Sequence, residues 1–160
     1  MTVKGLEHLL TVGQDFPAFS LEANDGKTYT NHTFKQMYLV YFYPRAMTPG
    51  CTAQACSLEQ AVSTGLTLPI LGVSPDTVDK QSKFAAKYNL TFPLLADTEL
   101  SLAKACGVWG PKTFMGITKE GLHRIAFLVS TEGKILEVFT KIKTKEFATQ
   151  VNEVLAKLDK

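Results

Sequence analysis

The sequence predicts an α/β fold with a mixed central sheet, flanking helices and hairpins towards both ends, in a single domain over residues 1–160. Apolar runs typical of buried strands alternate with helix-compatible segments, which is the order of an α/β domain. Asn24-Asp25-Gly26 and the stretch STEGK at 130–134 are turn sequences, and each separates two short strand-like runs. With 45% hydrophobic and 20% charged residues, the chain has the composition of one globular domain.

The first half of the chain is expected to supply a hairpin and two central strands. Alternating runs within 19–31 predict an N-terminal hairpin. A continuous apolar and aromatic run at 37–43 (MYLVYFY) predicts a strand buried on both faces. The run at 66–73 predicts a second such strand, although Pro69 weakens its first half because proline cannot donate to a strand ladder. A helix from about 48 to 63 is expected to connect the two strands.

The second half is expected to continue this alternation. The predicted elements are an amphipathic helix over 78–90, a short strand within 91–98, a short helix over 100–106, a hairpin with arms at 125–129 and 135–139, and a C-terminal helix. An apolar stripe at helical spacing indicates the last helix, and its members are Phe147, Val151, Val154, Leu155 and Leu158.

Composition and charge narrow the expected partners. A net charge of +2 with scattered basic residues does not indicate nucleic-acid binding, and no stretch of the chain suggests a membrane span. Residues 1–26 contain no apolar core followed by a small-residue cleavage site, so no secretory signal is expected. Three cysteines make no disulfide framework. A reducing cytoplasm is therefore the expected compartment, where neighbouring thiols are typically catalytic, sensing or metal-binding.

Cys51 lies at the predicted start of a helix that follows a buried strand. Pro44 ends the strand, because it cannot donate to the ladder. Thr48 and Pro49 have the residue types preferred at a helix N-cap and at the first helical position. Cys51 then falls in the first turn, where unpaired backbone N–H groups and the helix dipole stabilise a thiolate. We therefore expect Cys51 to be nucleophilic.

Cys56 follows five residues later on the same predicted helix. At 1.5 Å rise and 100° per residue, the two Cα atoms are about 8.7 Å apart. A disulfide requires Cα atoms within roughly 7 Å of each other. A bond between the two sulfurs would therefore require the first turns of the helix to unwind.

The stretch around Cys51 resembles a known active-site motif. Pro44, Thr48 and Cys51 match all three defining positions of the P-x-x-x-T-x-x-C motif of peroxiredoxins. The second cysteine five residues later is similar to the bacterioferritin-comigratory-protein (peroxiredoxin Q) group, as are the segments 107–116 and 121–135. The resemblance covers nearly the whole chain. It implies a thioredoxin-like fold with an N-terminal β-hairpin extension, and the reduction of hydroperoxides by cysteine.

The resemblance also implies a role for each matching residue. Cys51 would be the peroxidatic cysteine and Cys56 the resolving cysteine, which closes an intramolecular disulfide. Thr48 would hydrogen-bond the thiolate and the peroxide, and Pro44 would wall the pocket. Arg124, which begins an apolar run, would reach the site from a neighbouring strand and stabilise negative charge there. An unpaired guanidinium at such a position is costly, so we expect it to have an anionic partner.

The implied partners are a hydroperoxide and a thioredoxin or glutaredoxin-type dithiol that reduces the disulfide by exchange. No metal or organic cofactor is implied, and we expect neither nucleic acid nor a membrane as a partner. His8, His32 and His123 share no ligand spacing with the cysteines, which argues against a zinc site. The related group suggests a monomer.

Less specific interpretations remain open for several residues. Cys56 and Cys106 could be packed, idle thiols, and Cys106 could instead be the resolving cysteine. Arg124 could be a surface strand residue. Trp109 and Phe114 could be core aromatics, or could line the pocket or the surface that meets the reductant.

Two other classes of function are also open. The same disulfide could belong to a redox-sensing interaction protein. The chain could also be a general disulfide oxidoreductase, although the lack of a C-x-x-C motif argues against that.

Overall fold

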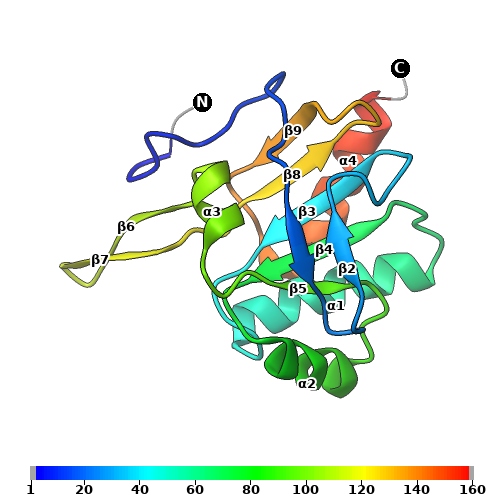
Figure 1. Cartoon of the computed structure of the whole chain (residues 1–160), viewed down its shortest axis with the longest axis horizontal. Coiled ribbons are helices and arrows are strands. Elements are labelled where there is room, and N and C mark those ends of the chain that lie inside the picture. Colours follow the sequence, from blue (N-terminus) through cyan, green and yellow to red (C-terminus); the bar gives the residue numbers. More distant parts are fainter. Residues whose placement is uncertain (1–2, 159–160) are drawn as a thin grey trace.

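The computed structural model describes residues 3–158, and its centre is a five-stranded sheet (Figure 1). The middle strand is β3 (Tyr38–Phe42). On one side β3 pairs in parallel with β4 (Ile70–Ser74), which pairs in parallel with β5 (Leu94–Ala96). On the other side β3 pairs antiparallel with β8 (Ala126–Val129), which pairs antiparallel with β9 (Ile135–Phe139). The mixed central sheet is therefore confirmed.

Each face of the sheet is covered by a different set of elements. The helices are α1 (Pro49–Ser63), α2 (Val78–Tyr88), α3 (Ser101–Cys106), α4 (Phe147–Leu158) and the short 3-10 helix η1 (Thr144–Glu146). One buried cluster joins side chains of α1, α2 and α4 to the sheet, and a second joins α3, the N-terminal segment and the first hairpin to the opposite face. Side chains of β3 alternate between these clusters, as the period of a strand requires.

Apart from the short helix η1, which was not predicted, the elements agree with the sequence prediction except at three places. The first hairpin is formed by β1 (Ser20–Glu22) and β2 (Thr28–Thr30), as expected. β4 begins only at Ile70, directly after Pro69, so the proline excludes the first half of the predicted run from the strand. α2 ends at Tyr88, because Asn89 adopts the left-handed conformation (φ 54°) typical of a helix C-cap.

The third difference is a hairpin that the sequence analysis did not predict. β6 (Trp109–Phe114) and β7 (Ile117–Leu122) pair antiparallel, and the resulting hairpin projects from the body of the molecule (Figure 1, yellow-green to yellow). Residues 111–120 are all exposed. The usual sign of a strand, alternation between apolar and polar residues, is therefore absent here, because neither face of the ribbon is buried between residues 111 and 120.

None of the helices within residues 3–158 is long and apolar enough to cross a membrane.

Candidate active site

Cys51 occupies the position that the sequence predicted. β3 ends at Phe42, and α1 begins at Pro49 after Thr48, whose extended backbone (φ −75°, ψ 155°) marks the N-cap. Cys51 is the third residue of α1 and only 1% exposed. The site thus combines the carboxyl end of a central strand with the N-terminal turn of a helix, where unpaired N–H groups favour a negative charge.

Arg124 reaches Cys51 from the strand on the other side of β3. Because β8 runs antiparallel to β3, the start of β8 lies beside the end of β3, and Phe42 N donates a hydrogen bond of 2.8 Å to Ile125 O. Arg124 precedes this point, and its Nη2 donates to Cys51 Sγ at 3.4 Å. The guanidinium is therefore in contact with the Cys51 sulfur, and the anionic partner expected from the sequence stays a prediction.

Gln54 is a site residue that the sequence analysis missed. It is fully buried on α1, and its Oε1 accepts a hydrogen bond of 2.8 Å from Arg124 Nη1. Gln54 lies three residues after Cys51, so the two side chains share one face of the helix and hold the two ends of one guanidinium. The available signal was this spacing: a polar residue at i+3 from the proposed nucleophile. It is weak by itself, because helices carry many polar residues.

Gly50 leaves the space through which Arg124 approaches the sulfur. A Cβ added at Gly50 would lie 3.1 Å from Arg124 Nη2, which is closer than ordinary van der Waals contact. An alanine here would force the guanidinium to shift by a few tenths of an ångström. The close approach of Arg124 therefore explains why a glycine precedes Cys51, which the motif alone does not explain.

Thr48 and Pro44 frame the loop that leads to Cys51. The Thr48 hydroxyl donates to Arg45 O at 2.9 Å, and its side chain makes no capping bond to the helix. Its predicted hydrogen bond to the thiolate is thus not among the bonds of this structure, and its contact with peroxide stays a prediction. Pro44 is half-buried directly after Tyr43, at the carboxyl end of β3.

A polar network holds the same loop from the side of α2. Asp76 Oδ2 accepts 2.7 Å hydrogen bonds from Ala46 N and from Ser74 Oγ. Ser74 Oγ accepts a further bond of 2.8 Å from Gln81 Nε2, and the Tyr43 hydroxyl donates to Gln81 Oε1. Met47, within the loop, has the left-handed φ of 68°, which is strained for a residue other than glycine.

Cys56 lies on the same unbroken helix as Cys51. The two residues are separated by about 1.4 turns of α1, and all three cysteines are free thiols. Cys56 is half-buried, and burial together with the charge of Glu59 raises the pKa of its thiol. With α1 intact the two sulfurs cannot bond, as the spacing predicted.

Cys106 is separated from the site by the sheet. It is fully buried on α3 and belongs to the cluster on the face opposite that of Cys51. Burial, with a smaller effect of Asp97, raises its pKa well above that of a free thiol. This environment favours the interpretation of Cys106 as a packed, unreactive thiol.

Arg124 also lines an open, cationic cleft. The cleft has a volume of about 510 Å³, and its lining includes Lys112, His123, Lys141 and Lys143. Lys112 Nζ donates to Leu122 O at 2.9 Å. Burial and, next, the charge of Arg124 lower the pKa of Lys112, while Cys51 acts in the opposite direction. The lysine of the hairpin is therefore electrostatically linked to the site.

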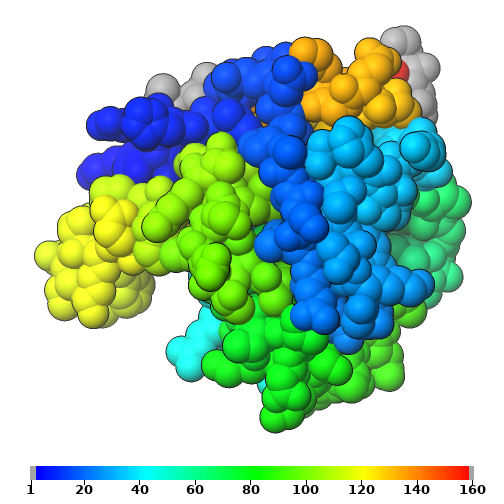
Figure 2. Space-filling view, viewed as in Figure 1, coloured from blue at the N-terminus to red at the C-terminus, as the bar shows by residue number. Residues whose placement is uncertain are grey.

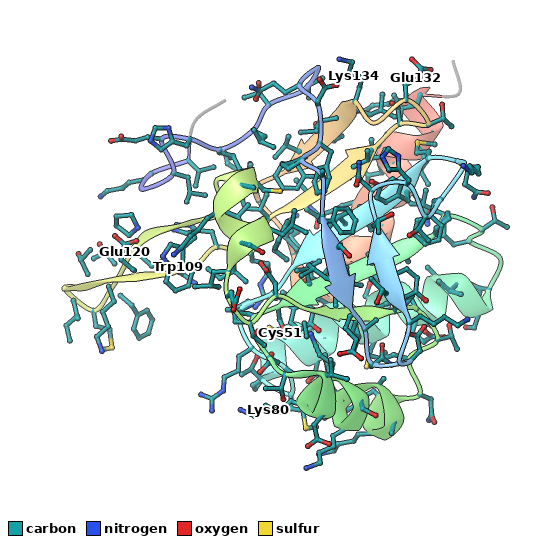
Figure 3. All side chains as sticks on the ribbon, in the orientation of Figure 1. Cys51, Lys80, Trp109, Glu120, Glu132 and Lys134 are labelled. Atoms are coloured by element: carbon teal, nitrogen blue, oxygen red, sulfur yellow. The ribbon has the colours of Figure 1, made fainter. Side chains whose placement is uncertain are left out.

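The other candidate residues lie outside this arrangement. Trp109 is half-buried at the base of the projecting hairpin, whereas Phe114 is 77% exposed, so its interpretation as a core aromatic is wrong. Figure 3 labels Trp109 and Glu120 on the hairpin and Cys51 on the body of the molecule. Within residues 3–158, no three His, Cys, Asp or Glu side chains gather in a group that could hold a metal ion.

Comparison with known families finds one model that matches most of the chain. Residues 12–138 match the AhpC/TSA family. The chain is 43% identical over 152 residues to a putative peroxiredoxin Bcp of Haemophilus influenzae, covering 93% of this chain and 98% of that protein. It is 46% identical over 138 residues to the peroxiredoxin Bcp of Escherichia coli K12, covering 84% and 88%.

Solved structures of related proteins share the fold. The bacterioferritin comigratory protein of Xanthomonas campestris superposes with a TM-score of 0.80 at 30% identity, covering 89% of this chain and 92% of that one. A cysteine-to-serine variant of Xylella fastidiosa PrxQ superposes with a TM-score of 0.82 at 27% identity, covering 96% and 99%. The thioredoxin-like fold expected from the sequence is therefore confirmed.

Proposed function

This chain belongs to the AhpC/TSA family, within its Bcp and PrxQ peroxiredoxins, and we propose that it is a thiol peroxidase whose attacking atom is the sulfur of Cys51. The observation that carries the proposal is the contact between Arg124 Nη2 and a buried sulfur in the first turn of α1. A guanidinium and a helix N-terminus directed at one thiol stabilise its thiolate form, which is the nucleophile that peroxide reduction requires. The proposed substrates are hydrogen peroxide and small organic hydroperoxides.

In the proposed first step, the Cys51 thiolate attacks the terminal oxygen of the hydroperoxide. The S–O bond forms as the O–O bond breaks, so sulfur is oxidised and the peroxide is reduced by two electrons. The departing oxygen takes a proton and leaves as water or an alcohol, and Cys51 becomes a sulfenic acid. Arg124 is proposed to stabilise the charge that moves from sulfur onto the peroxide oxygens.

Thr48 and Pro44 are proposed to shape the place where peroxide binds. The Thr48 hydroxyl already donates to Arg45 O, which leaves its oxygen lone pairs to accept a hydrogen bond from the peroxide O–H. Pro44 has no N–H, and in the proposal its ring closes one wall of the pocket. It would thereby limit access of water to the sulfenic acid.

In the proposed second step, Cys56 resolves the sulfenic acid. The Cys56 sulfur attacks the Cys51 sulfur, the S–O bond breaks, and water leaves as the disulfide forms. Because both residues lie on the continuous helix α1, this step requires the first turns of the helix to unwind. A thioredoxin or glutaredoxin-type dithiol is then proposed to return both thiols by exchange, with the enzyme acting as a monomer in the cytoplasm.

Mass spectrometry of peroxide-treated protein tests both steps. With one equivalent of peroxide, wild type should form a disulfide between Cys51 and Cys56. The Cys56→Ser variant should stop at a sulfenic acid on Cys51, and Cys51→Ser should not consume peroxide over repeated cycles. Cys106→Ala is the matched control, and it should form the same disulfide as wild type.

Three outcomes would count against the proposal. Disulfide formation in Cys56→Ser at the wild-type rate would assign resolution to Cys106. Continued turnover by Cys51→Ser would remove the proposed nucleophile. A single turnover that stalls in the presence of a complete thioredoxin system would favour the redox-sensing alternative.

A further inference from the structure

We propose that one face of the β6–β7 hairpin, which we name the hairpin face, is the docking surface for the dithiol protein that reduces the active site. The hairpin face consists of Lys112 and Phe114 on β6 and Ile117 and Lys119 on β7. This inference rests on the proposed function and adds to it the surface and the chemistry of the partner.

Beyond Trp109 and Leu122 at its base, the hairpin contributes little to the folded core. Its two strands pack chiefly against each other, and residues 111–120 are all exposed. Its base is fixed to the N-terminal segment, where a Cβ at Gly110 would lie only 2.3 Å from Gly5 O. In the space-filling view the hairpin (yellow) stands beyond a hollow that separates it from the green part of the surface around α2 (Figure 2). A two-stranded ribbon of this kind is barely stable alone. Its exposed residues add little to the stability of the fold, and we infer that they serve binding instead.

The tip of the hairpin is apolar where solvent would favour polar residues. Phe114 and Ile117 face each other across the strands and are 77% and 60% exposed, and Met115 beside them is 85% exposed. Met115 and Gly116 form the two-residue turn, with φ values of 52° and 79°. Such a turn favours asparagine or glycine at both positions. An exposed methionine in that strained position indicates that its side chain is used in a contact.

The hairpin face carries positive charge next to the apolar tip. Lys112 pairs directly with Lys119, and this pair lies two residues from the pair of Phe114 and Ile117, hence on the same side of the ribbon. Like charges placed directly opposite each other destabilise a strand pair. Repulsion between the two lysines is therefore expected to weaken the pairing of β6 with β7. An acidic partner that binds the hairpin face would neutralise this repulsion.

The hairpin face is continuous with the active site. Lys112 lines the same cleft as Arg124, whose guanidinium contacts Cys51 Sγ. Phe114 lies two residues beyond Lys112, which is about 7 Å along a strand. A protein interface of ordinary size covers about 800 Å² on each partner, equivalent to a disc of roughly 16 Å radius. A protein that reaches the cysteines would extend over the hairpin tip, whereas a small peroxide would not.

The charges indicate the chemistry of the partner. Lys112, Arg124, Lys141 and Lys143 line the cleft, and Lys119 pairs with Lys112 next to the apolar tip. A complementary surface is therefore acidic where it faces the cleft and apolar where it faces the tip. The proposed reaction requires one macromolecular partner at this site, the dithiol reductant. A second copy of the chain fits poorly, because a symmetric contact would bring the same cationic surfaces together.

Steady-state kinetics with two reductants tests the proposal. The double variant Phe114→Ser/Ile117→Ser should raise the KM for thioredoxin at least about tenfold, as truncation of interface anchors commonly does. Its turnover with dithiothreitol and its rate of reaction with peroxide should stay at the wild-type values, because neither small molecule contacts the tip. Val12→Ser is the matched control: Val12 is 59% exposed and lines a different pocket, beside β9, so its KM for thioredoxin should not change.

Two further variants distinguish loss of docking from misfolding of the hairpin. Met115→Asn places a residue that favours the left-handed turn, and Lys119→Glu replaces repulsion across the strands with attraction to Lys112. Both should strengthen the hairpin and still raise the KM for thioredoxin. Lys119→Glu should also weaken the dependence of that KM on salt concentration.

Each result decides between distinct claims. Unchanged KM values for thioredoxin in all three hairpin variants would overturn the docking role, as would an equal loss of turnover with dithiothreitol. A wild-type dimer that becomes a monomer in the double variant would assign the surface to a second copy instead. A wild type without turnover on either thioredoxin or dithiothreitol would overturn the proposed function itself, and the docking role with it.

Discussion

Gln54 and the sulfur of Cys51, the proposed nucleophile, contact the same guanidinium, that of Arg124. The guanidinium has two contacts in the site, with Gln54 Oε1 at 2.8 Å and with Cys51 Sγ at 3.4 Å. The shorter bond is to a buried amide on the same helix face, so it restricts the rotation of the guanidinium without adding a charge. Gln54 is thus a positioning residue, and the electrostatic effect on sulfur comes from Arg124.

We predict that Gln54→Leu slows the reaction with peroxide about tenfold, which corresponds to about 1.4 kcal/mol in the barrier. The leucine keeps the buried volume but releases the guanidinium from its fixed orientation. The measurement is the second-order rate of peroxide reduction by stopped flow. Thr52→Val is the control, because the buried Thr52 hydroxyl has no hydrogen-bond partner among residues 3–158 and its removal should leave the rate unchanged. Equal rates for Gln54→Leu and wild type would contradict the positioning role.

At the scale of residues, the sequence was informative where a motif defines positions. Pro44, Thr48 and Cys51 are assigned from their match to the P-x-x-x-T-x-x-C motif, and the helix start predicted for Cys51 is confirmed. Gln54 and Gly50 were not found. Both residues contact Arg124, which lies about 70 positions away in the chain. Arg124 becomes their neighbour only through the antiparallel pairing of β3 and β8, which the sequence does not show.

The loop between β3 and α1 is held closed by a bond that opposes local strain. Asp76 accepts the Ala46 N–H within this loop, while Met47 next to it has a φ of 68°. A non-glycine residue in that conformation is strained by about 1 kcal/mol or more. Release of the bond would therefore allow the loop and the first turn of α1 to open, which is the motion that disulfide formation requires.

We predict that Asp76→Ala increases the rate of disulfide formation from the sulfenic acid about tenfold. Loss of a hydrogen bond to a charged group costs the closed state roughly 1.5–3 kcal/mol, so the opened state is populated more often. Faster resolution also protects Cys51 from a second oxidation, so less sulfinic acid should be found by mass spectrometry at high peroxide.

The control for this experiment is Asp79→Ala on the same side of the molecule. Asp79 is exposed on α2 and forms a surface ion pair of 3.2 Å with Lys83, so its loss should not affect the loop. An unchanged yield of sulfinic acid in Asp76→Ala would show that the Ala46 N–H bond does not control opening.

At the scale of elements, strands that are buried were predicted well and an exposed ribbon was not. β3 is buried throughout, and its apolar run was sufficient evidence for a strand. β6 and β7 are held by pairing with each other, with Pro111 and two glycines at their base, and nothing in their sequence shows the period of a half-buried strand. Exposure removes the signal that strand prediction uses.

At the scale of the whole molecule, the sheet separates the proposed nucleophile, Cys51, from the buried thiol of Cys106. Cys51 and the helices that carry the site lie in one cluster, while Cys106 lies in the other with Tyr38. The side chains of Cys106 and Tyr38 are both buried and neutral. Burial raises the pKa of Tyr38 to about 12, with a further contribution from Cys106, and burial raises the pKa of Cys106 well above its usual value.

We predict from these two groups that stability falls when the pH rises above about 8.5. In the unfolded chain a cysteine loses its proton near 8.5 and a tyrosine near 10. In the folded chain both protons are held to higher pH, so above these values the unfolded state binds fewer protons than the folded state. The free energy of unfolding then decreases as pH rises. The stabilisation is complete at neutral pH and is lost between the unfolded and folded pKa values.

Urea unfolding midpoints measured from pH 7 to 11 check this prediction, with wild type compared with Cys106→Ala and Tyr38→Phe. Each variant will have its own stability at pH 7, so the informative quantity is the slope against pH. Cys106→Ala should reduce the part of the decline that begins near pH 8.5, to which Cys56 also contributes. Tyr38→Phe should reduce the part that begins near pH 10, to which Tyr29, Tyr41 and Tyr43 also contribute. A wild-type midpoint that stays constant up to pH 10.5 would mean that water reaches these side chains. The barrier between the two faces of the sheet would then not isolate Cys106 from the redox chemistry of Cys51.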